Sequence, residues 1–312
     1  MMIKTRTTFA AFVMLFAASF VPSQARAQGI EQVAGSITDS FQYALDLLPQ
    51  DVTALRIGVG AAILPEYMGD DRYKISPAFA ISFRYRDLIE IDNNEIKITA
   101  LSRLVGTATN IGGGKLRFGP LLSVDFGRKE KNSRDLTGLG NIGTSIELGA
   151  FVGYAYGPVR TRIKARHDVA GGHSGTLVKG DVSLAIYRDD KLSIGSHIST
   201  SWASSKYMNA NFSITAAQSV ASGLPVYAAG SGLRDVSLGA VGSYAISPRF
   251  TVIADAGYSR LLSGAKKNPL IQQRGSTDQF SLSSYLVYSF SVRTADEQRP
   301  LPYNRPIPRA NQ

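Results

Sequence analysis

The chain contains no cysteine and, after its first residues, no apolar run long enough to form a membrane-spanning helix. Without cysteine there is no disulfide framework to hold a small secreted scaffold together. Histidine is also scarce, with 3 among 312 residues, and no group of His, Asp and Glu has the spacing of metal ligands. The sequence therefore predicts no metal and no cofactor.

The first 27 residues have the organisation of a secretory signal peptide. Lys4 and Arg6 form a charged start, an apolar run follows over 9–21, and Ala25-Arg26-Ala27 has the small-x-small pattern of a cleavage site. The alternative, an N-terminal membrane anchor, needs about 20 apolar residues, more than this run provides. We expect an exported chain that begins at Gln28.

The formal net charge of +10 falls to +7 when the three cations of the signal peptide are removed. A basic balance can indicate nucleic-acid binding. Here the charges are dispersed, with no basic helix and no zinc pattern, and export separates the chain from nucleic acid. We therefore expect no nucleic-acid partner.

The most informative segment is 280–290, which reads FSLSSYLVYSF. Alternate side chains of a strand point to opposite faces, which predicts a mostly small, polar face and a largely apolar one made by Phe280, Leu282, Leu286, Tyr288 and Phe290. A tilted strand of ~9–11 residues crosses a bilayer, and aromatic side chains gather at the membrane interfaces. The segment is typical of the C-terminal strand of outer-membrane β-barrels, the signal for barrel-assembly machinery.

The same alternation recurs along the chain, over 53–63, 73–85, 115–127, 141–156 and 249–259. A soluble β-sandwich also alternates. However, the polar faces here are small or charged, and no second set of strongly apolar strands is present to fill a sandwich core. The pattern favours an all-β, transmembrane, antiparallel up-and-down barrel in the outer membrane of a Gram-negative cell, in contact with lipid.

Turn lengths predict the number of strands. Outer-membrane barrels have short periplasmic turns and longer outer loops. Short turns fall at 86–87, 156–158, 188–190 and 247–249, and longer connections at 64–72, 128–140, 205–231 and 263–276. For the two kinds to alternate, a strand pair near 87–92 and 95–104 is needed, with a turn at Asn93-Asn94. The total is then about twelve.

The sequence therefore predicts four segments: a signal peptide (1–27), a periplasmic N-terminal segment (28–52), the barrel (53–291) and a Pro/Arg-rich periplasmic tail (292–312). Apolar residues over 30–48 have roughly helical spacing, which predicts a short periplasmic helix or a small plug. The four prolines of the tail favour extended structure. It is either disordered or a tether for a protein partner or an anionic wall polymer.

One strand carries four cations on one face: Arg160, Arg162, Lys164 and Arg166. Facing lipid near the bilayer midplane, each would cost ~2–4 kcal/mol, so this basic ladder must face the lumen. Its mutual repulsion requires inward-pointing counter-charges, for which we select Asp125, Glu147, Asp181 and Asp235. The ladder is either part of a salt-bridge network that fills a narrow barrel or the lining of an anion-selective pore.

No catalytic set is evident. Residues 138–143 match G-x-G-x-x-G, but a charged loop precedes them and a strand follows, so a dinucleotide site is excluded. His167, His173 and His197 raise the alternative of an outer-membrane lipid hydrolase. Nucleophilic catalysis needs a hydroxyl, a base and an orienting group in a specific set, and the sequence shows none, so we expect no enzyme.

Several segments together resemble the MipA/OmpV family of outer-membrane proteins. They are Gly58-Val59-Gly60, Pro65-Glu66-Tyr67-Met68-Gly69-Asp70, Leu116-Arg117-Phe118-Gly119-Pro120, Leu136-Thr137-Gly138-Leu139-Gly140, Glu147-Leu148-Gly149, Ser222-Gly223-Leu224-Pro225-Val226-Tyr227 and Tyr288-Ser289-Phe290. The resemblance covers about 53–290. It implies an outer-membrane barrel without known catalytic residues and, for the member that names the family, a scaffold that links a murein lytic transglycosylase to a murein synthase.

The expected function is a non-enzymatic envelope scaffold. The alternatives are a small anion-permeable channel and, third, a lipid hydrolase. The chain departs from the family pattern in the 22 residues after Phe290, since family barrels usually end at that phenylalanine.

Overall fold

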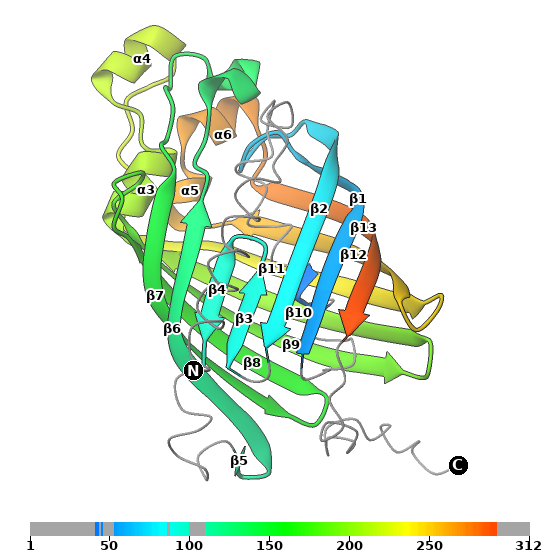
Figure 1. The fold of residues 1–312 in the computed structure, drawn as a ribbon. Coiled ribbons are helices and arrows are strands. Elements are labelled where there is room, and N and C mark those ends of the chain that lie inside the picture. Colours follow the sequence, from blue (N-terminus) through cyan, green and yellow to red (C-terminus); the bar gives the residue numbers. More distant parts are fainter. Residues whose placement is uncertain (1–40, 44, 46–52, 86–87, 100–109, 292–312) are drawn as a thin grey trace, which may run out of the picture.

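The structure is a computed structural model that describes residues 41–43, 45, 53–85, 88–99 and 110–291. Twelve strands form a closed antiparallel barrel (Figure 1). They are β1 (Thr53–Pro65), β2 (Tyr73–Tyr85), β3 (Ile89–Asp92), β4 (Glu95–Ile98), β6 (Gly114–Asp125), β7 (Ser145–Tyr156), β8 (Val159–Asp168), β9 (Thr176–Arg188), β10 (Leu192–Ala203), β11 (Gly232–Ala245), β12 (Phe250–Leu261) and β13 (Asp278–Ser291). The prediction of an antiparallel barrel of about twelve strands is confirmed.

Two pairings close the ring. β13 pairs with β1, and β4 pairs with β6, although a short strand lies between these two in the chain. That strand, β5 (Asn110–Ile111), pairs with the start of β6 across Gly112 and Gly113. Both glycines have positive φ, as a tight two-residue hairpin requires. The expected pair near 87–92 and 95–104 corresponds to β3 and β4, and residues 100–109 lie outside the described part.

The outer surface of the barrel is apolar, as a lipid-facing surface must be. Along β13, Phe280, Leu282, Leu286 and Phe290 are exposed, whereas Ser283 and Tyr285, on the opposite face, are buried inside. Comparable exposed apolar side chains occur on β1, β2 and β7 to β12. No helix among the described residues is long and apolar enough to cross a membrane.

The two ends of the barrel differ. Short turns join most of the strands at one end. The other end carries the β3–β4 turn, the β8–β9 connection 169–175 and four further connections: 66–72, 126–144, 204–231 and 262–277 (Figure 1). These four connections contain η1 (Glu130–Asn132), η2 (Arg134–Leu136), α3 (Ser205–Phe212), α4 (Ala216–Ser222), α5 (Ser263–Lys266) and α6 (Pro269–Arg274). We call them together the outer cap. By the loop-length rule for outer-membrane barrels, the cap end is the outer side.

The outer cap has a core of its own. One apolar cluster joins Tyr67, Leu136, Leu139, Ile214, Leu224 and Leu270, which come from all four connections. A second cluster places Tyr207, Met208 and Phe212 of α3 against Leu177, Leu261 and Ile271. The outer cap is therefore a packed structure and not a set of independent loops.

The described part of the N-terminal segment lies inside the barrel. Phe41, Gln42, Tyr43 and Leu45 are helical and buried, and we call them the plug residues. Phe41, Tyr43 and Leu45 pack against inward-facing Ala78, Ala80, Val241, Ile253, Tyr285 and Val287. Of the two alternatives for 30–48, a periplasmic helix and a small plug, these residues correspond to the plug. The expected signal peptide and the tail 292–312 lie outside the described residues.

Candidate functional site in the barrel lumen

The basic ladder of β8 faces the lumen, where neighbouring carboxylates balance it. Arg162 Nη2 lies 3.0 Å from Asp181 Oδ2 on β9, and Arg166 Nε lies 3.1 Å from Glu147 Oε2 on β7. Both carboxylates are almost fully buried. Because adjacent strands bring these pairs together, the pairing of β7, β8 and β9 fixes them directly.

Lys164 has a partner that the sequence did not indicate. Its Nζ lies 3.0 Å from one carboxylate oxygen of Glu95 and 3.1 Å from the other, and both residues are buried. Glu95 is on β4, which is not adjacent to β8 in the ring. The contact therefore crosses the lumen.

Glu95 joins the ladder to a second charged cluster. Lys97 Nζ lies 3.5 Å from Glu95, 3.1 Å from Asp92 and 2.5 Å from Glu90. Glu90 is also within 3.2 Å of Arg84 and 3.0 Å of Arg117. A continuous ion-pair network thus runs from Arg84 on β2 to Lys164 on β8 through the interior. Ion pairs this deeply buried fill the barrel and fix its side chains, but add little net stability.

The other two expected counter-charges, Asp125 and Asp235, lie near the outer cap. The Asp125 carboxylate accepts a hydrogen bond from the backbone N–H of Gly127 at 2.8 Å, at the outer end of β6. Asp235 is paired with Arg234, its neighbour in β11. Both carboxylates line a cavity in the lumen, together with Lys164 and Arg166 of the ladder.

The plug residues connect this network to the apolar side of the lumen. The ring of Tyr43 stacks on His197, and Arg162 Cζ lies 5.9 Å from the centre of the same ring. The Gln42 amide is 3.3 Å from Glu90 and 3.4 Å from Asp92. Phe41 packs on Tyr285, with ring centroids 5.6 Å apart. The signal for this contact is in the sequence, since Tyr285 and Val287 are large apolar residues on the inward face of β13.

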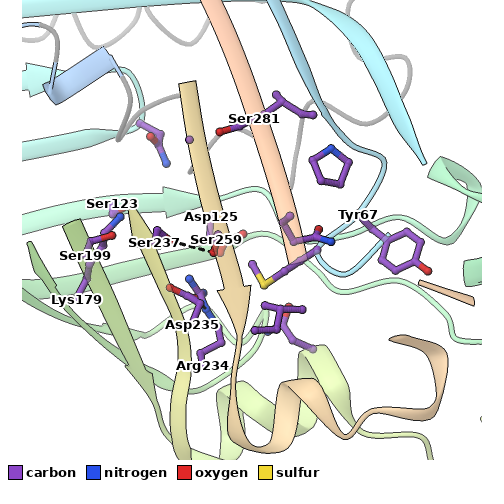
Figure 2. Close-up of a pocket in the computed structure, with 18 of the residues that line it drawn as sticks. Tyr67, Ser123, Asp125, Lys179, Ser199, Arg234, Asp235, Ser237, Ser259 and Ser281 are labelled. Atoms are coloured by element: carbon purple, nitrogen blue, oxygen red, sulfur yellow. Dashed lines mark hydrogen bonds and ion pairs between the residues drawn. The ribbon is translucent and has the colours of Figure 1, made fainter. Parts of the chain in front are cut away.

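Between the plug residues and the outer cap is a cavity of about 200 Å³ (Figure 2). Its lining includes serine hydroxyls from five strands: Ser123, Ser199, Ser237, Ser259 and Ser281. Ser237 donates to Ser259 at 2.9 Å. Tyr207 of α3 borders the cavity at the cap, accepts a hydrogen bond from Arg234 at 2.6 Å, and has a raised pKa because it is buried.

Asp125, Glu147 and His173 form the one cluster among the described residues with metal-ligand composition, since their ligand atoms all lie within 4.8 Å. The geometry does not suit a metal. The backbone N–H of Gly175 donates to His173 Nδ1 at 3.0 Å, so Nε2 carries the proton of the neutral ring and points at Glu147. A metal ion bound at Nε2 would require the ring proton to be on Nδ1. Nδ1 instead accepts the hydrogen bond from the Gly175 N–H.

The other two histidines are also engaged. His197 Nε2 lies 3.1 Å from Asp255, and His167 Nδ1 lies 2.9 Å from Thr176. In the described part of the chain, no serine hydroxyl is hydrogen-bonded to a histidine ring. The hydroxyl that contacts a histidine ring is that of Thr176, and a pair of a serine hydroxyl with a histidine base is not among these contacts.

A family model described as MltA-interacting protein MipA matches residues 57–290. A search of curated proteins finds no match. Among solved structures, the chain is similar to an outer-membrane channel from Pseudomonas putida F1, with 10% identity, a TM-score of 0.39 and coverage of 78% of this chain and 97% of that one. It is also similar to the translocator domain of the autotransporter NalP from Neisseria meningitidis, with 9% identity, a TM-score of 0.34 and coverage of 85% and 100%. At these TM-scores we transfer no activity from either protein.

Proposed function

Because the chain belongs to the MltA-interacting protein MipA family, we propose that this outer-membrane β-barrel is a non-enzymatic scaffold that connects murein-remodelling enzymes to the outer membrane. The name of the family supports a lytic transglycosylase of the MltA type as one partner. A murein synthase is the second partner of the proposal. Both act on murein, so the binding surface would be on the periplasmic side.

The observation that carries this proposal is the filled lumen. The plug residues occupy the space between the ion-pair network and the apolar wall of β11 to β13. Twelve strands enclose an interior that side chains can fill, unlike the wide porins of 16 or more strands. A barrel of this kind supports a role in anchoring better than a role in bulk permeation.

The periplasmic end offers the partner a small charged surface. Asp189, Asp190 and Lys191 are exposed in the turn between β9 and β10, and Arg249 is exposed in the turn between β11 and β12. β13 terminates at the same end, and the Pro/Arg-rich tail, 292–312, comes after it in the sequence. We call these two turns the periplasmic rim, and we propose that the rim and the tail together contact the transglycosylase.

The test is binding of a purified MltA-type lytic transglycosylase to the full chain in lipid nanodiscs. Two changes are made at the periplasmic end: removal of 292–312, and the pair Lys191→Glu and Arg249→Glu. The matched control is Lys131→Glu with Arg134→Glu, two exposed cations of the outer cap. We expect the periplasmic changes to weaken binding and the cap changes to leave it unaltered.

Absence of binding by the unaltered chain would overturn the scaffold proposal. Equal binding after removal of 292–312 would exclude the tail as the contact but would leave the rim to be judged by the charge-reversed pair. Loss of binding in the cap variant alone would place the partner on the opposite side of the membrane and would also contradict the proposal.

A second candidate is a small anion-permeable channel, favoured by the inward-facing cations of β8. Their pairing with Asp181, Glu147 and Glu95 reduces the positive potential that would attract an anion. Single-channel recording separates this candidate from the scaffold.

A further inference from the structure

The barrel wall is interrupted beside β2. The strands β3 and β4 have 4 residues each, whereas β2 has 13 and β6 has 12. The pairing of β2 with β3 ends at Ser82 and Asp92. On that side, no strand in the described part of the chain pairs with Tyr73–Ala80. Figure 1 shows the β3–β4 hairpin ending well below the outer end of β2.

This opening, which we call the side window, has a defined frame. Its lower edge is the hairpin tip, where Asn93 Oδ1 accepts from Ile81 N at 2.8 Å and Asn94 Nδ2 donates to Val124 O at 2.6 Å. Across its upper edge, Arg72 Nη2 contacts Ser133 Oγ at 2.7 Å and Asp135 Oδ2 at 2.5 Å. The frame is therefore held by hydrogen bonds on both edges.

The side window lies at a height where the barrel faces lipid. The outward side chains of β2 beside it include Ile75, 75% exposed, and Phe79, 58% exposed. Phe126, at the end of β6, is also exposed. Large apolar side chains exposed around an opening in a membrane wall favour the entry of an apolar chain rather than of a water-soluble solute.

Behind the side window lies the serine-lined cavity. Asn94, Val124 and Phe126, which the frame of the side window contains, also line the cavity, so the cavity reaches the lower edge of the window and its β6 side. Its deeper wall is polar, with the serine hydroxyls already described. The surface is thus apolar at the frame of the side window and rich in hydroxyl groups inside the cavity.

The charges of the cavity are nearly balanced. Its lysine and arginine side chains are Lys164, Arg166, Lys179 and Arg234, and its carboxylates are Glu95, Asp125, Glu147, Asp235 and Asp255. Most of these are paired with one another. A net negative head group would add to the excess of one carboxylate. A net positive head group would compete with Lys164, Arg166 and Arg234 for carboxylates that are already paired, which is costly in a buried site.

The size of the cavity fixes how much of a ligand it can hold. At about 200 Å³ it is smaller than the ~300–1,000 Å³ of pockets that enclose drug-sized molecules. It can take a polar head group but not a lipid with its tail. The tail must then leave through the side window into the surrounding bilayer.

We propose that the side window and the serine-lined cavity form a binding site for a single-chain amphiphile whose head group has no net charge. The head lies among the hydroxyls, and the acyl chain lies across the frame between β2 and β6. This site is on the outer half of the barrel and is independent of the periplasmic scaffold surface.

The probe is a lysophosphatidylethanolamine with a twelve-carbon chain, measured by native mass spectrometry on the full chain released from micelles. Because the chain has no cysteine, single labelling sites can be introduced cleanly. Phe126→Cys is modified with a bulky maleimide at the frame. The matched control is Ile198→Cys with the same label, an exposed, outward site on β10.

We expect one bound lysolipid, ~10-fold weaker binding after labelling at 126, and no change after labelling at 198. A second variant, Ser281→Phe, narrows the cavity and should also weaken binding. It provides an independent test if labelling at 126 causes the protein to unfold or aggregate. Absence of the lysolipid adduct, equal binding of laurate, or binding unaffected by the label at 126 would each overturn the site. Displacement of the lysolipid by an extended peptide that pairs with β2 would assign the side window to a protein partner instead.

Discussion

The phenol ring of Tyr43 stacks on the imidazole of His197, with 3.9 Å between ring centroids and 13° between the planes. His197 is held in turn by Asp255 at 3.1 Å. The N-terminal segment and the middle of the barrel wall are thus joined through one aromatic contact in the lumen. This contact orients the plug residues between the ion-pair network and the apolar wall.

Glu95 is predicted to be the most sensitive carboxylate of the network. Glu95→Gln leaves Lys164 and Lys97 buried with less compensation, and breaking a buried ion pair in this way costs ~3–5 kcal/mol. We expect a corresponding loss in the free energy of unfolding, measured by urea titration in micelles. The double variant Glu95→Gln/Lys164→Met removes both charges and should regain most of the loss. Equal destabilisation by the double variant would contradict the proposed pairing.

The outer cap is predicted to depend on Leu136, which is fully buried in the cluster shared by all four connections. Leu136→Ala should cost ~2–5 kcal/mol of local stability through the cavity that it leaves. Limited proteolysis of outer-membrane vesicles should then cleave the connection 126–144 while the barrel stays intact. Val220→Ala in α4, where the side chain is 89% exposed, is the control and should leave cleavage unchanged.

Asp70 in the outer cap should make the stability of the folded chain depend on pH. Burial raises the pKa of Asp70, and its contacts with Arg72 offset this only in part. The folded state therefore binds the proton more tightly than the unfolded state, so stability rises as pH falls from above the raised pKa toward the ordinary value of 3.8. We expect the melting temperature of the unaltered chain, relative to Asp70→Asn, to increase on acidification over this range. A difference that decreases would contradict the assignment.

Zinc is predicted to have no specific effect through His173 and Glu147. A ligand present at 100 times its dissociation constant would add ~2.7 kcal/mol to the free energy of unfolding. We expect no saturable rise in melting temperature when Zn²⁺ is added to the chelator-treated protein. A rise that disappears in His173→Ala would show that the Gly175 contact yields to a metal.

The wall of the barrel could be predicted from the sequence because a strand has a period of two residues and one face meets lipid. The alternation predicts which face of each strand points inward, so it also predicts the contacts of β8 with Asp181 and Glu147 on the neighbouring strands. It does not predict the contact of Lys164 with Glu95, because that contact joins strands that are not neighbours and depends on how the barrel closes.

The helices of the outer cap could not be predicted in the same way. They have four to eight residues each, too few to be stable alone, and are held by tertiary contacts of residues such as Met208 and Leu270. The spacing over 30–48 did predict a helix. Its position inside the barrel depends on Tyr285 and Val287, whose inward orientation becomes informative only when the strand is placed in the wall.

Single-channel recording in planar bilayers tests the central claim, that the lumen is filled and the barrel acts as an anchor. The account predicts no stable conductance steps from the unaltered chain. The variant Phe41→Ala/Gln42→Ala/Tyr43→Ala, which removes the plug side chains, is predicted to give openings and so serves as the positive control. Regular steps from the unaltered chain, with an anion selectivity that is lost in Arg162→Glu, would contradict the account and establish the channel instead.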